Sequence, residues 1–418
     1  MPLRSPEVSF VLATFNRREV AAHTLTRILQ CGLDRCDYEV IVVDNASSDG
    51  TPDVVADVAD RVIRLDQNMG SCAKAVGTDH ARGRYIVFLD DDSYPRPGSV
   101  SRMIRRFEED PRLAAAGYTV CLHDGRREGS ALPGVFVGCG VGLRSDVLQA
   151  VGGLDRTFFM QAEEYDLCFR LVSAGWGIGV FEDVQVEHLK SPAARRSDRT
   201  TFLDVRNNLR VVERYLPDPY RRIYRKEFIQ RYKWLAERDG HRSAWAKGVV
   251  AGRWLSAVER LGYRSHRLGP DAFERLYCWE RVRAEMAGLA RSGVCRVVLA
   301  DLGKNCYPFV RGAELAGITV RAIGDDRFCA PKRVYRGVPI LPEDEALKLE
   351  PDAYVVANTG AVHAAATHNR LMGRTSRPVH CWFSTPDQTP SRQSDSQDAR
   401  YSADDNNTTT ERIQAAEV

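Results

Sequence analysis

The sequence predicts an α/β protein built around a mostly parallel sheet, and three observations lead to this fold class. Short apolar runs rich in β-branched residues recur at 8–13, 38–43 and 85–89. Helical patterns at 20–29 and 52–59 separate them. Polar clusters follow the ends of the apolar runs. Strands that alternate with helices form parallel sheets, which carry their functional groups at the carboxyl ends of the strands.

The polar clusters are the first candidates for a functional site. Residues 14–17 follow the first strand, residues 44–49 the second, and residues 90–92 the run that ends at Leu89. A further strand is predicted at 61–65. Because parallel strands end at one edge of the sheet, we expect the three clusters to lie along one rim.

Three consecutive carboxylates, Asp90, Asp91 and Asp92, form the most informative cluster. At about 4 Å each pair repels by roughly 1 kcal/mol in water, and several-fold more at a partly dry site. A divalent cation would turn this repulsion into attraction, and oxygen ligands suit Mg²⁺ or Mn²⁺. The alternative is a solvated acidic turn that caps the next helix.

Six stretches of the chain closely resemble the family 2 glycosyltransferases. They are VSFVLATFNR, VIVVDNASSDGT, NMGSCAKAVG, GRYIVFLDDD, VGGLDRTFFMQAEEYDLCFRL and VQVEHLK, in the family's order between about residues 7 and 190. These enzymes, the rhamnosyltransferases among them, have the GT-A fold. The resemblance implies inverting transfer of a sugar from a nucleotide-diphosphate donor to a hydroxyl of a glycan or lipid-linked acceptor.

The first two stretches suggest how the donor base is bound. Asp44, at a strand end, can accept a hydrogen bond from the imide N–H of uracil or thymine, which favours UDP- or dTDP-sugars over GDP-sugars. The resemblance implies that Thr14, Asn16 and Arg17 frame the base and ribose. The side chains of residues 45–49 fit a tight turn equally well.

The next stretch concerns the diphosphate. Asn68, Gly70 and Lys74 match the family pattern N-x-G…[KR], in which the basic residue faces the diphosphate. Ala75 stands where the family often has Asn, a departure that affects one ribose or phosphate contact.

The resemblance also implies a metal site for Mn²⁺ or Mg²⁺. Asp92 would contact the cation most directly, Asp90 would orient ribose or metal-bound water, and Asp91 is the third donor-side carboxylate. His188 follows an apolar strand at a position where the family often has an additional ligand. Alternatively, His188 is a polar residue whose hydrogen bonds are satisfied by its surroundings.

An acceptor hydroxyl needs a general base, because its proton must leave during attack. Glu164 falls on the base position of the family's acidic motif, and Glu163 is the competing candidate. Both could instead be first-turn carboxylates favoured by the helix dipole. Asp166 either caps this helix or binds the acceptor.

A glycine-rich segment lies between the metal triplet and the candidate base. The family places acceptor and donor-sugar contacts near Gly138, Cys139 and Gly140. Small residues let a sugar approach the backbone closely. Cys139 is interpreted as a small filler, because an inverting transfer needs no covalent intermediate.

We predict four regions: a GT-A domain at 1–200, a helical extension at 201–290, a small Rossmann-like α/β module at 291–383 and a disordered tail at 384–418. The extension is basic and rich in Trp, so it either contacts anionic lipid headgroups or a lipid-diphosphate acceptor or is a solvated surface. The module lacks G-x-G-x-x-G and either binds a nucleotide or mediates assembly.

Composition sets the remaining limits. The chain has 418 residues, of which 44% are hydrophobic and 28% charged, typical of globular proteins, and a net charge of +3 gives no case for a nucleic-acid partner. Eleven cysteines without CxxC pairs, and no signal peptide, predict reduced thiols in the cytoplasm. No apolar stretch is long enough to span a bilayer, so membrane contact is expected to be peripheral. The rival interpretations are a catalytically silent sugar-nucleotide-binding scaffold and an oxidoreductase built on the terminal module.

Overall fold

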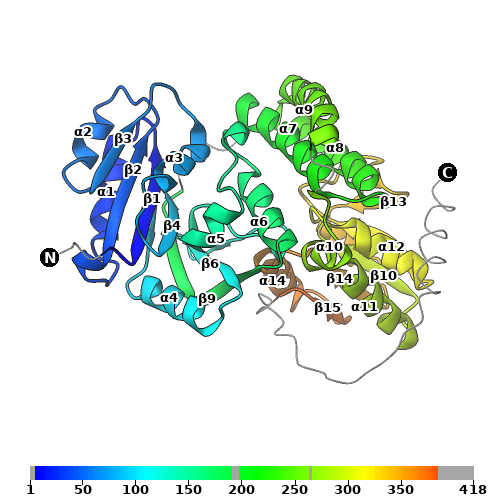
Figure 1. Ribbon diagram of the computed structural model, residues 1–418. Helices are drawn as coiled ribbons and strands as arrows, with labels where there is room; N and C mark the ends of the chain where they lie inside the picture. The colour runs from blue at the N-terminus through cyan, green and yellow to red at the C-terminus, as the bar shows by residue number, and fades with distance from the viewer. Residues whose placement is uncertain (1–4, 191–196, 263–265, 385–418) are drawn as a thin grey trace, which may run out of the picture.

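The computed structural model describes residues 5–190, 197–262 and 266–384, which form two sheets with helices packed between and around them (Figure 1). The basic run at 193–196 and the predicted disorder of residues 385–418 lie outside the described residues. All eleven cysteines are described, and none forms a disulfide. Within the described ranges every helix is too short or too polar to cross a membrane.

The first sheet has nine strands in the order β3-β2-β1-β4-β8-β6-β9-β5, with β7 paired to β6. Its strands are β1 Val8–Thr14, β2 Tyr38–Asp44, β3 Arg61–Arg64, β4 Tyr85–Asp90, β5 Ser93–Pro95, β6 Leu113–Leu122, β7 Arg127–Glu128, β8 Gly140–Arg144 and β9 Gly177–His188. Strands β1 to β4 are parallel, whereas β8 runs antiparallel to β4 and β6. This mixed sheet agrees with the predicted α/β class.

The register of the first sheet brings the polar clusters together, as predicted. Thr14 pairs with Asp44 across β1 and β2, and Ala13 pairs with Asp90 across β1 and β4. Side chains alternate between the two faces of a strand. Phe10 therefore packs in the core under α1 and α4, whereas Val11 packs in the opposite core with α5 and α6.

Helices cover both faces of this sheet (Figure 1). They are α1 Arg18–Ile28, α2 Thr51–Val55, α3 Lys74–Thr78, α4 Ser99–Glu109, α5 Ser145–Ala150 and α6 Glu163–Ser173, with short 3₁₀ turns at Arg35–Asp37, Gly70–Ala73 and Arg156–Phe158. Helix α2 ends four residues earlier than the predicted helix at 52–59.

A group of helices connects the two sheets. It comprises α7 Asp198–Tyr215, α8 Tyr220–Asp239, α9 Arg242–Gly262, α10 Pro270–Tyr277 and α11 Trp279–Arg291. Gly248 and Gly252 let α9 approach α7 closely, because a Cβ at either position would lie 2.8 Å from an atom of α7. Helix α7 also packs against α6 and so connects the extension to the first sheet.

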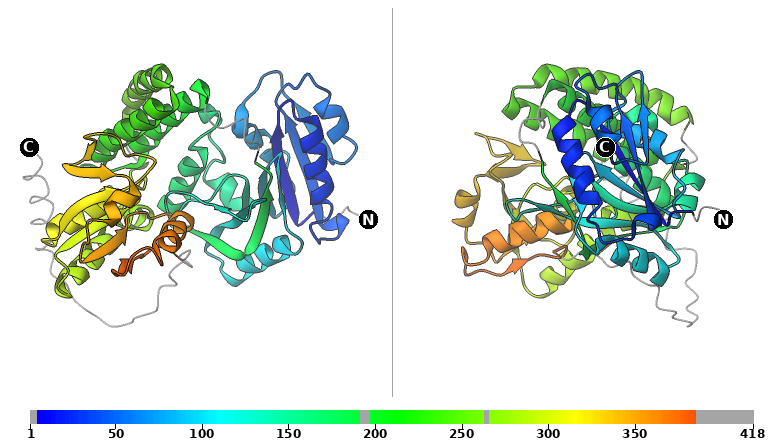
Figure 2. Two further views of the ribbon diagram at one scale, coloured as in Figure 1. Left: turned by 180° about the vertical axis from the view of Figure 1, so that it is seen from behind. Right: turned by 90° about the vertical axis from the view of Figure 1, so that its left-hand side faces the viewer.

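The second sheet lies at the opposite end of the molecule from the first strands (Figure 2). Its order is β12-β13-β11-β10-β14-β15, parallel except for the β12–β13 pair. The elements are β10 Arg296–Ala300, α12 Tyr307–Leu315, β11 Thr319–Gly324, β12 Val334–Tyr335, β13 Val338–Leu341, α13 Glu343–Leu347, β14 Ala353–Val356, α14 Ala361–Leu371 and β15 Val379–His380. The arrangement agrees with the predicted Rossmann-like unit.

Candidate active site

Asp44 ends β2 at the rim of the first sheet and is 2% exposed. Its Oδ2 accepts a hydrogen bond from the backbone N–H of Ser47 at 3.0 Å. Its Oδ1 is buried and has no hydrogen-bond partner among the described residues. A buried acceptor without a donor is costly, so this oxygen is suited to accept an N–H group from a ligand.

Asn16 lies beside Asp44 but has a structural contact of its own. Its Oδ1 accepts the backbone N–H of Ser48 at 2.8 Å, and its backbone adopts a φ of 50°. Asn16 therefore joins the loops after β1 and β2.

Lys74 is the first residue of α3, after the loop that follows β3, and it is almost fully buried. Its Nζ is 2.5 Å from Asp90 Oδ1 and donates to the carbonyl of Gly138 at 3.0 Å. Burial alone would lower the pKa of Lys74, but the carboxylate of Asp90 outweighs it and raises that pKa. Upstream, Asn68 Oδ1 accepts the N–H of Gly70, whose φ is 65°. The start of α3 thus presents a positive charge beside the carboxylate triplet.

Asp91 has both carboxylate oxygens occupied. Thr14 Oγ1 donates to one at 2.9 Å and Arg17 Nη1 to the other at 2.7 Å. The second guanidinium nitrogen of Arg17 donates to Asp92 at 3.0 Å. The structure therefore puts Arg17 and Thr14 against the triplet, whereas the expectation had them around the base near Asp44. Burial raises the pKa of Asp91 to about 6.

Asp92 and His188 form the centre of a chain of polar contacts. His188 Nε2 lies 3.2 Å from Asp92 Oδ1, and His188 Nδ1 lies 3.0 Å from Glu128 Oε2. Burial raises the pKa of Asp92, but the hydrogen bond from His188 outweighs it, so that pKa falls to about 2. Burial lowers the pKa of His188, whereas its bonds to Asp92, Cys139 and Glu128 raise it to about 12. Glu128 is a site residue that the sequence analysis missed.

The residues around His188 fit a divalent cation. Ligand atoms of Asp90, Cys139 and His188 all lie within 4.8 Å of one another, and Asp92 contacts the same imidazole. Carboxylate oxygens with one imidazole suit Mn²⁺ or Mg²⁺, and His188 would release its Nε2 proton to serve as a ligand. Burial raises the pKa of the Cys139 thiol, which keeps it protonated and a poor ligand for a hard cation.

Glu163 and Glu164 begin α6, and their side chains have different surroundings. Glu163 accepts a hydrogen bond from Ser71, and its other oxygen is buried without a partner among the described residues. Glu164 lines a pocket of about 440 Å³ together with Tyr165 and Asp204, and Glu163 is not among the lining residues. Burial, followed by the charge of Glu163, raises the pKa of Glu164 to about 8.

Residues 9–134 match the family model described as Glycosyl transferase family 2. These residues belong to that family. An overlapping segment, residues 116–252, matches the model of Glycosyl transferase family group 2. The first sheet of this glycosyltransferase domain is the mixed sheet expected for the GT-A fold.

Curated relatives match part of the chain. The succinoglycan biosynthesis protein ExoO of Rhizobium meliloti (strain 1021) is 38% identical over 128 residues, covering 29% of this chain and 36% of that protein. The GalNAc(5)-diNAcBac-PP-undecaprenol beta-1,3-glucosyltransferase of Campylobacter jejuni is 33% identical over 111 residues, covering 25% and 35%. The chain therefore spans about a third of the length of these relatives. Among solved structures, the mannosyltransferase PcManGT of Pyrobaculum calidifontis, in complex with GDP-Man and Mn²⁺, matches with 17% identity and a TM-score of 0.43, over 63% of this chain and 83% of that chain.

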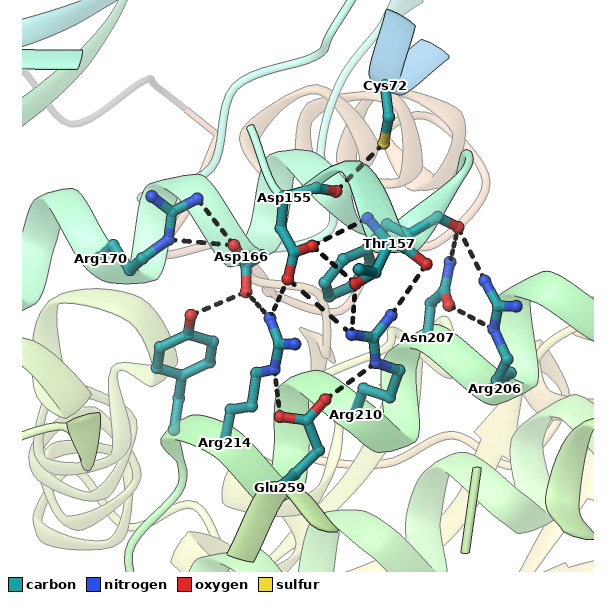
Figure 3. A network of polar contacts seen from close by, with 12 residues as sticks. Cys72, Asp155, Thr157, Asp166, Arg170, Arg206, Asn207, Arg210, Arg214 and Glu259 are labelled. Carbon is teal, nitrogen blue, oxygen red and sulfur yellow. Dashed lines mark hydrogen bonds and ion pairs between the residues drawn. The ribbon is translucent and has the colours of Figure 1, made fainter. Parts of the chain in front are cut away.

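A strained segment precedes the two glutamates of the glycosyltransferase domain. Three of its residues have a positive φ although none is glycine: Phe159, Gln161 and Ala162. Such conformations cost about 1–3 kcal/mol each and persist only where the surroundings hold them. The buried Asn207 side chain of α7 provides that support, because its Nδ2 donates to the carbonyls of Phe158, Met160 and Gln161 at 3.0, 2.9 and 2.8 Å. Figure 3 draws Asn207 with the first of these three bonds.

Asp166 does not reach an acceptor, and that prediction is wrong. The side chain is fully buried, and Oδ1 accepts from Arg214 at 2.8 Å and from the Tyr215 hydroxyl at 2.7 Å (Figure 3). Oδ2 accepts from Arg170 at 3.0 and 2.8 Å. The helix-cap alternative also fails, because no side chain caps the start of α6. Asp166 instead joins α6 to α7.

The two candidate glycines differ in position. A Cβ at Gly140 would lie 2.6 Å from Val186 within the sheet, so this glycine serves close strand packing instead of the expected acceptor contact. Gly138 has open space where a Cβ would point, and its carbonyl holds Lys74. Of the two, Gly138 is the one that leaves room beside its backbone.

Proposed function

We propose that this protein is a metal-dependent, inverting glycosyltransferase that uses a UDP- or dTDP-sugar and a hydroxyl acceptor on a glycan or lipid-linked sugar. The names of the two curated relatives support this acceptor class: one acts in succinoglycan biosynthesis, and the other is named for an undecaprenol-linked glycan. The observation that carries the proposal is the unsatisfied Oδ1 of Asp44 on the same rim as Lys74 and the carboxylate triplet.

Each part of the donor has a matching group on this rim. Asp44 accepts the imide N–H of the base, and Lys74 offers positive charge to the diphosphate. Asp90, Asp92 and His188 would hold Mn²⁺ or Mg²⁺. The bound cation would supply Lewis-acid stabilisation of the departing nucleotide diphosphate.

The acceptor reacts on the side of α6. Glu164 takes the proton from the acceptor hydroxyl as that oxygen forms a bond to the anomeric carbon. The bond from this carbon to the diphosphate oxygen breaks, and its electron pair leaves with the nucleotide diphosphate. A single displacement inverts the anomeric configuration. A base with a pKa close to the working pH is the most effective, which favours Glu164 with a pKa of about 8.

Calorimetric titration of UDP and CDP in the presence of Mn²⁺ tests the donor site. UDP should bind more tightly than CDP, because cytosine has no imide N–H to donate to Asp44. Asp44→Ala should weaken UDP about tenfold or more, the usual cost of a hydrogen bond to a charged group. Asp44→Asn should shift the preference toward CDP, because its amide can donate to the cytosine ring nitrogen.

The matched control is Asp57→Asn, which changes an exposed carboxylate on the surface. It should leave both affinities unchanged. Equal binding of UDP and CDP by the wild type, or UDP binding that survives Asp44→Ala, would contradict the proposed donor site.

We also propose peripheral contact with an anionic lipid surface through α9. Val250, Trp254 and Val258 are 71%, 70% and 56% exposed, and their spacing puts them on one face of the helix. Lys247 and Arg253 are exposed on the same helix, and no described side chain of α9 adds an exposed carboxylate. Trp254→Ser should reduce co-sedimentation with phosphatidylglycerol vesicles, and undiminished binding would remove the proposal.

A further inference from the structure

The second sheet forms a wall of the pocket that contains Glu164. Besides Glu164 this pocket is lined by Asp301 and Lys304, which follow β10, and by Arg327 and Asn358, which follow β11 and β14. These positions are the carboxyl ends of parallel strands, where open α/β sheets bind their ligands. The ligand edge of the second sheet and the candidate base of the first domain therefore share one pocket.

Direct contacts hold the second sheet in this position. Thr359 Oγ1 donates to the carbonyl of Ala131 at 3.2 Å, and His363 Nε2 lies 3.1 Å from the carbonyl of Gly129. A side chain at Gly360 would overlap the carbonyl of Ser130. The backbone of the segment after β7 thus lies directly against the loop after β14.

A second, larger pocket adjoins the first. It has a volume of about 1440 Å³ and lies between α8 and the second sheet. Arg231 and Lys304 line both pockets, which makes them the boundary between the two. Eight of the residues that line the larger pocket are Arg or Lys and two are Glu. The larger pocket is therefore strongly basic.

Four of these cations lack a carboxylate partner within the described residues: Lys226, Arg231, Lys233 and Lys304. Arg231 donates to the carbonyl of Leu302 at 2.6 Å, and Lys304 Nζ lies 3.9 Å from the centre of the Tyr165 ring. Other cations here are paired, for example Arg336 with Glu227 at 2.8 Å. Unpaired cations gathered in a pocket repel each other, and a multivalent anion would relieve this repulsion through charge-assisted hydrogen bonds.

The smaller pocket has the chemistry of a sugar site. Tyr165, Tyr232 and Phe136 supply aromatic surface, and Asp204 and Asn358 supply polar groups. Ligand sites for small polar molecules combine apolar walls with a few such groups. A sugar in this pocket would have its hydroxyls close to Glu164, with the basic pocket beyond Arg231 and Lys304.

We propose that the basic pocket binds the phosphate or diphosphate group of the acceptor, and that Arg231 and Lys304 hold this group so that the attached sugar reaches Glu164. The acceptor class is then a sugar phosphate or sugar diphosphate, either free or lipid-linked. This inference rests on the proposed function, because it takes Glu164 as the base. It gives the second sheet a role in acceptor recognition, beyond the alternatives of nucleotide binding and assembly.

The test is calorimetric titration of inorganic diphosphate into the full chain in the presence of EDTA at constant ionic strength. Lys304→Met and Arg231→Met should each weaken binding about tenfold, the usual loss for one charge-assisted hydrogen bond. Lys304→Met keeps the apolar stem that covers Tyr165. Lys226→Met, at an exposed position, gives a second variant that does not disturb the core.

A control shows where the anion binds. Lys348→Met changes an exposed lysine of the second domain outside both pockets and should have no effect. Diphosphate binding that is insensitive to both Lys304→Met and Lys226→Met would overturn the proposal.

Titration of UDP with Mn²⁺ on the same variants separates the two proposals. Wild type that binds no UDP would refute the proposed function, whatever diphosphate does. Normal UDP binding with unchanged diphosphate affinity in the pocket variants would refute only the acceptor inference. Geranyl diphosphate and glucose 1-phosphate then identify the source: tighter binding of geranyl diphosphate than inorganic diphosphate indicates a lipid-linked acceptor, and preference for glucose 1-phosphate indicates a free phosphorylated sugar.

Discussion

Two parts of the candidate site differ in how their carboxylates are compensated: the rim of the first sheet, here called the donor wall, and the pocket that contains Glu164, here called the acceptor wall. On the donor wall, formed by the rim of the first sheet, Asp90 pairs with Lys74 at 2.5 Å and Asp92 lies 3.2 Å from His188. The pKa of Asp92 is about 2, because the hydrogen bond from His188 outweighs the effect of burial. Asp91 is the exception, since burial raises its pKa to about 6 despite its contact with Arg17.

On the acceptor wall, Glu164, Asp204 and Asp301 have no ion pair among the described residues. Burial raises the pKa of Glu164 to about 8, and of Asp204 and Asp301 to about 6 each. The difference agrees with the proposed function: fixed charge would suit a wall that holds a diphosphate and a cation, whereas a carboxylate that titrates near neutral pH would suit proton transfer. Arg231 and Lys304, also without ion pairs, share the acceptor wall and leave it open to an anion.

Replacement of the base should have the largest effect and tests the acceptor wall directly. Glu164→Gln keeps the shape of the side chain but cannot accept the proton, so kcat should fall about 10²- to 10⁴-fold. UDP affinity should stay within about twofold, because the donor wall is unchanged. In the wild type kcat/KM should rise with pH up to about 8 as Glu164 loses its proton, and this rise should be absent in the variant.

Glu163→Gln is the matched comparison, because Glu163 is the neighbouring residue and does not line the pocket. Its effect on kcat should be much smaller. A larger loss of kcat for Glu163→Gln than for Glu164→Gln would make Glu163 the base. The electrostatic contrast between the donor wall and the acceptor wall would then not explain which residue takes the proton.

The second prediction concerns the donor wall. Glu128 accepts from His188 Nδ1 and thereby orients Nε2 toward Asp92. Glu128→Gln should lower Mn²⁺ affinity about 10- to 100-fold, as is usual for the partner of a ligating histidine. Electron paramagnetic resonance of free Mn²⁺ measures this affinity with UDP present.

The control is Asp124→Asn, an exposed carboxylate on the turn before β7. Its Mn²⁺ affinity should equal that of the wild type. Unchanged Mn²⁺ affinity in Glu128→Gln would show that His188 does not bind the metal. His188 would then be a polar residue whose only role is to hydrogen-bond with its neighbours.

The sequence predicted the donor wall well because its geometry follows from local pattern. Apolar runs give the strands, parallel strands end on one edge, and Thr14, Asp44 and Asp90 occupy those ends. The functional roles of these residues remain predictions. Glu128 was missed because it lies in the two-residue strand β7, which leaves no periodic signal.

The acceptor wall could not be predicted in the same way, because it depends on contacts between distant segments. Asp166 looked available, yet Arg214 and Tyr215 of α7 bury it from 48 and 49 residues away. Lys304 reaches the pocket of Glu164 only because the second sheet docks on the first domain. No pattern in either segment specifies such docking.

The smallest expected effect is on stability, and it tests the origin of the raised pKa of Glu164. The folded chain keeps this proton up to pH about 8, whereas in the unfolded chain the carboxyl releases it near its usual value of 4.5. Between these values the folded state binds more protons, so the contribution to the free energy of unfolding is full below pH 4.5 and is lost as the pH rises toward 8.

Glu164→Gln removes this loss of stability. Its Tm should therefore exceed that of the wild type at pH 9 by about 1 °C for each kcal/mol recovered, with a smaller difference at pH 4.5. Glu19→Gln, in the exposed first turn of α1, should show no such pH-dependent difference. Equal Tm differences at both pH values would mean that burial does not hold the proton on Glu164, and the acceptor wall would then resemble the donor wall in its electrostatics.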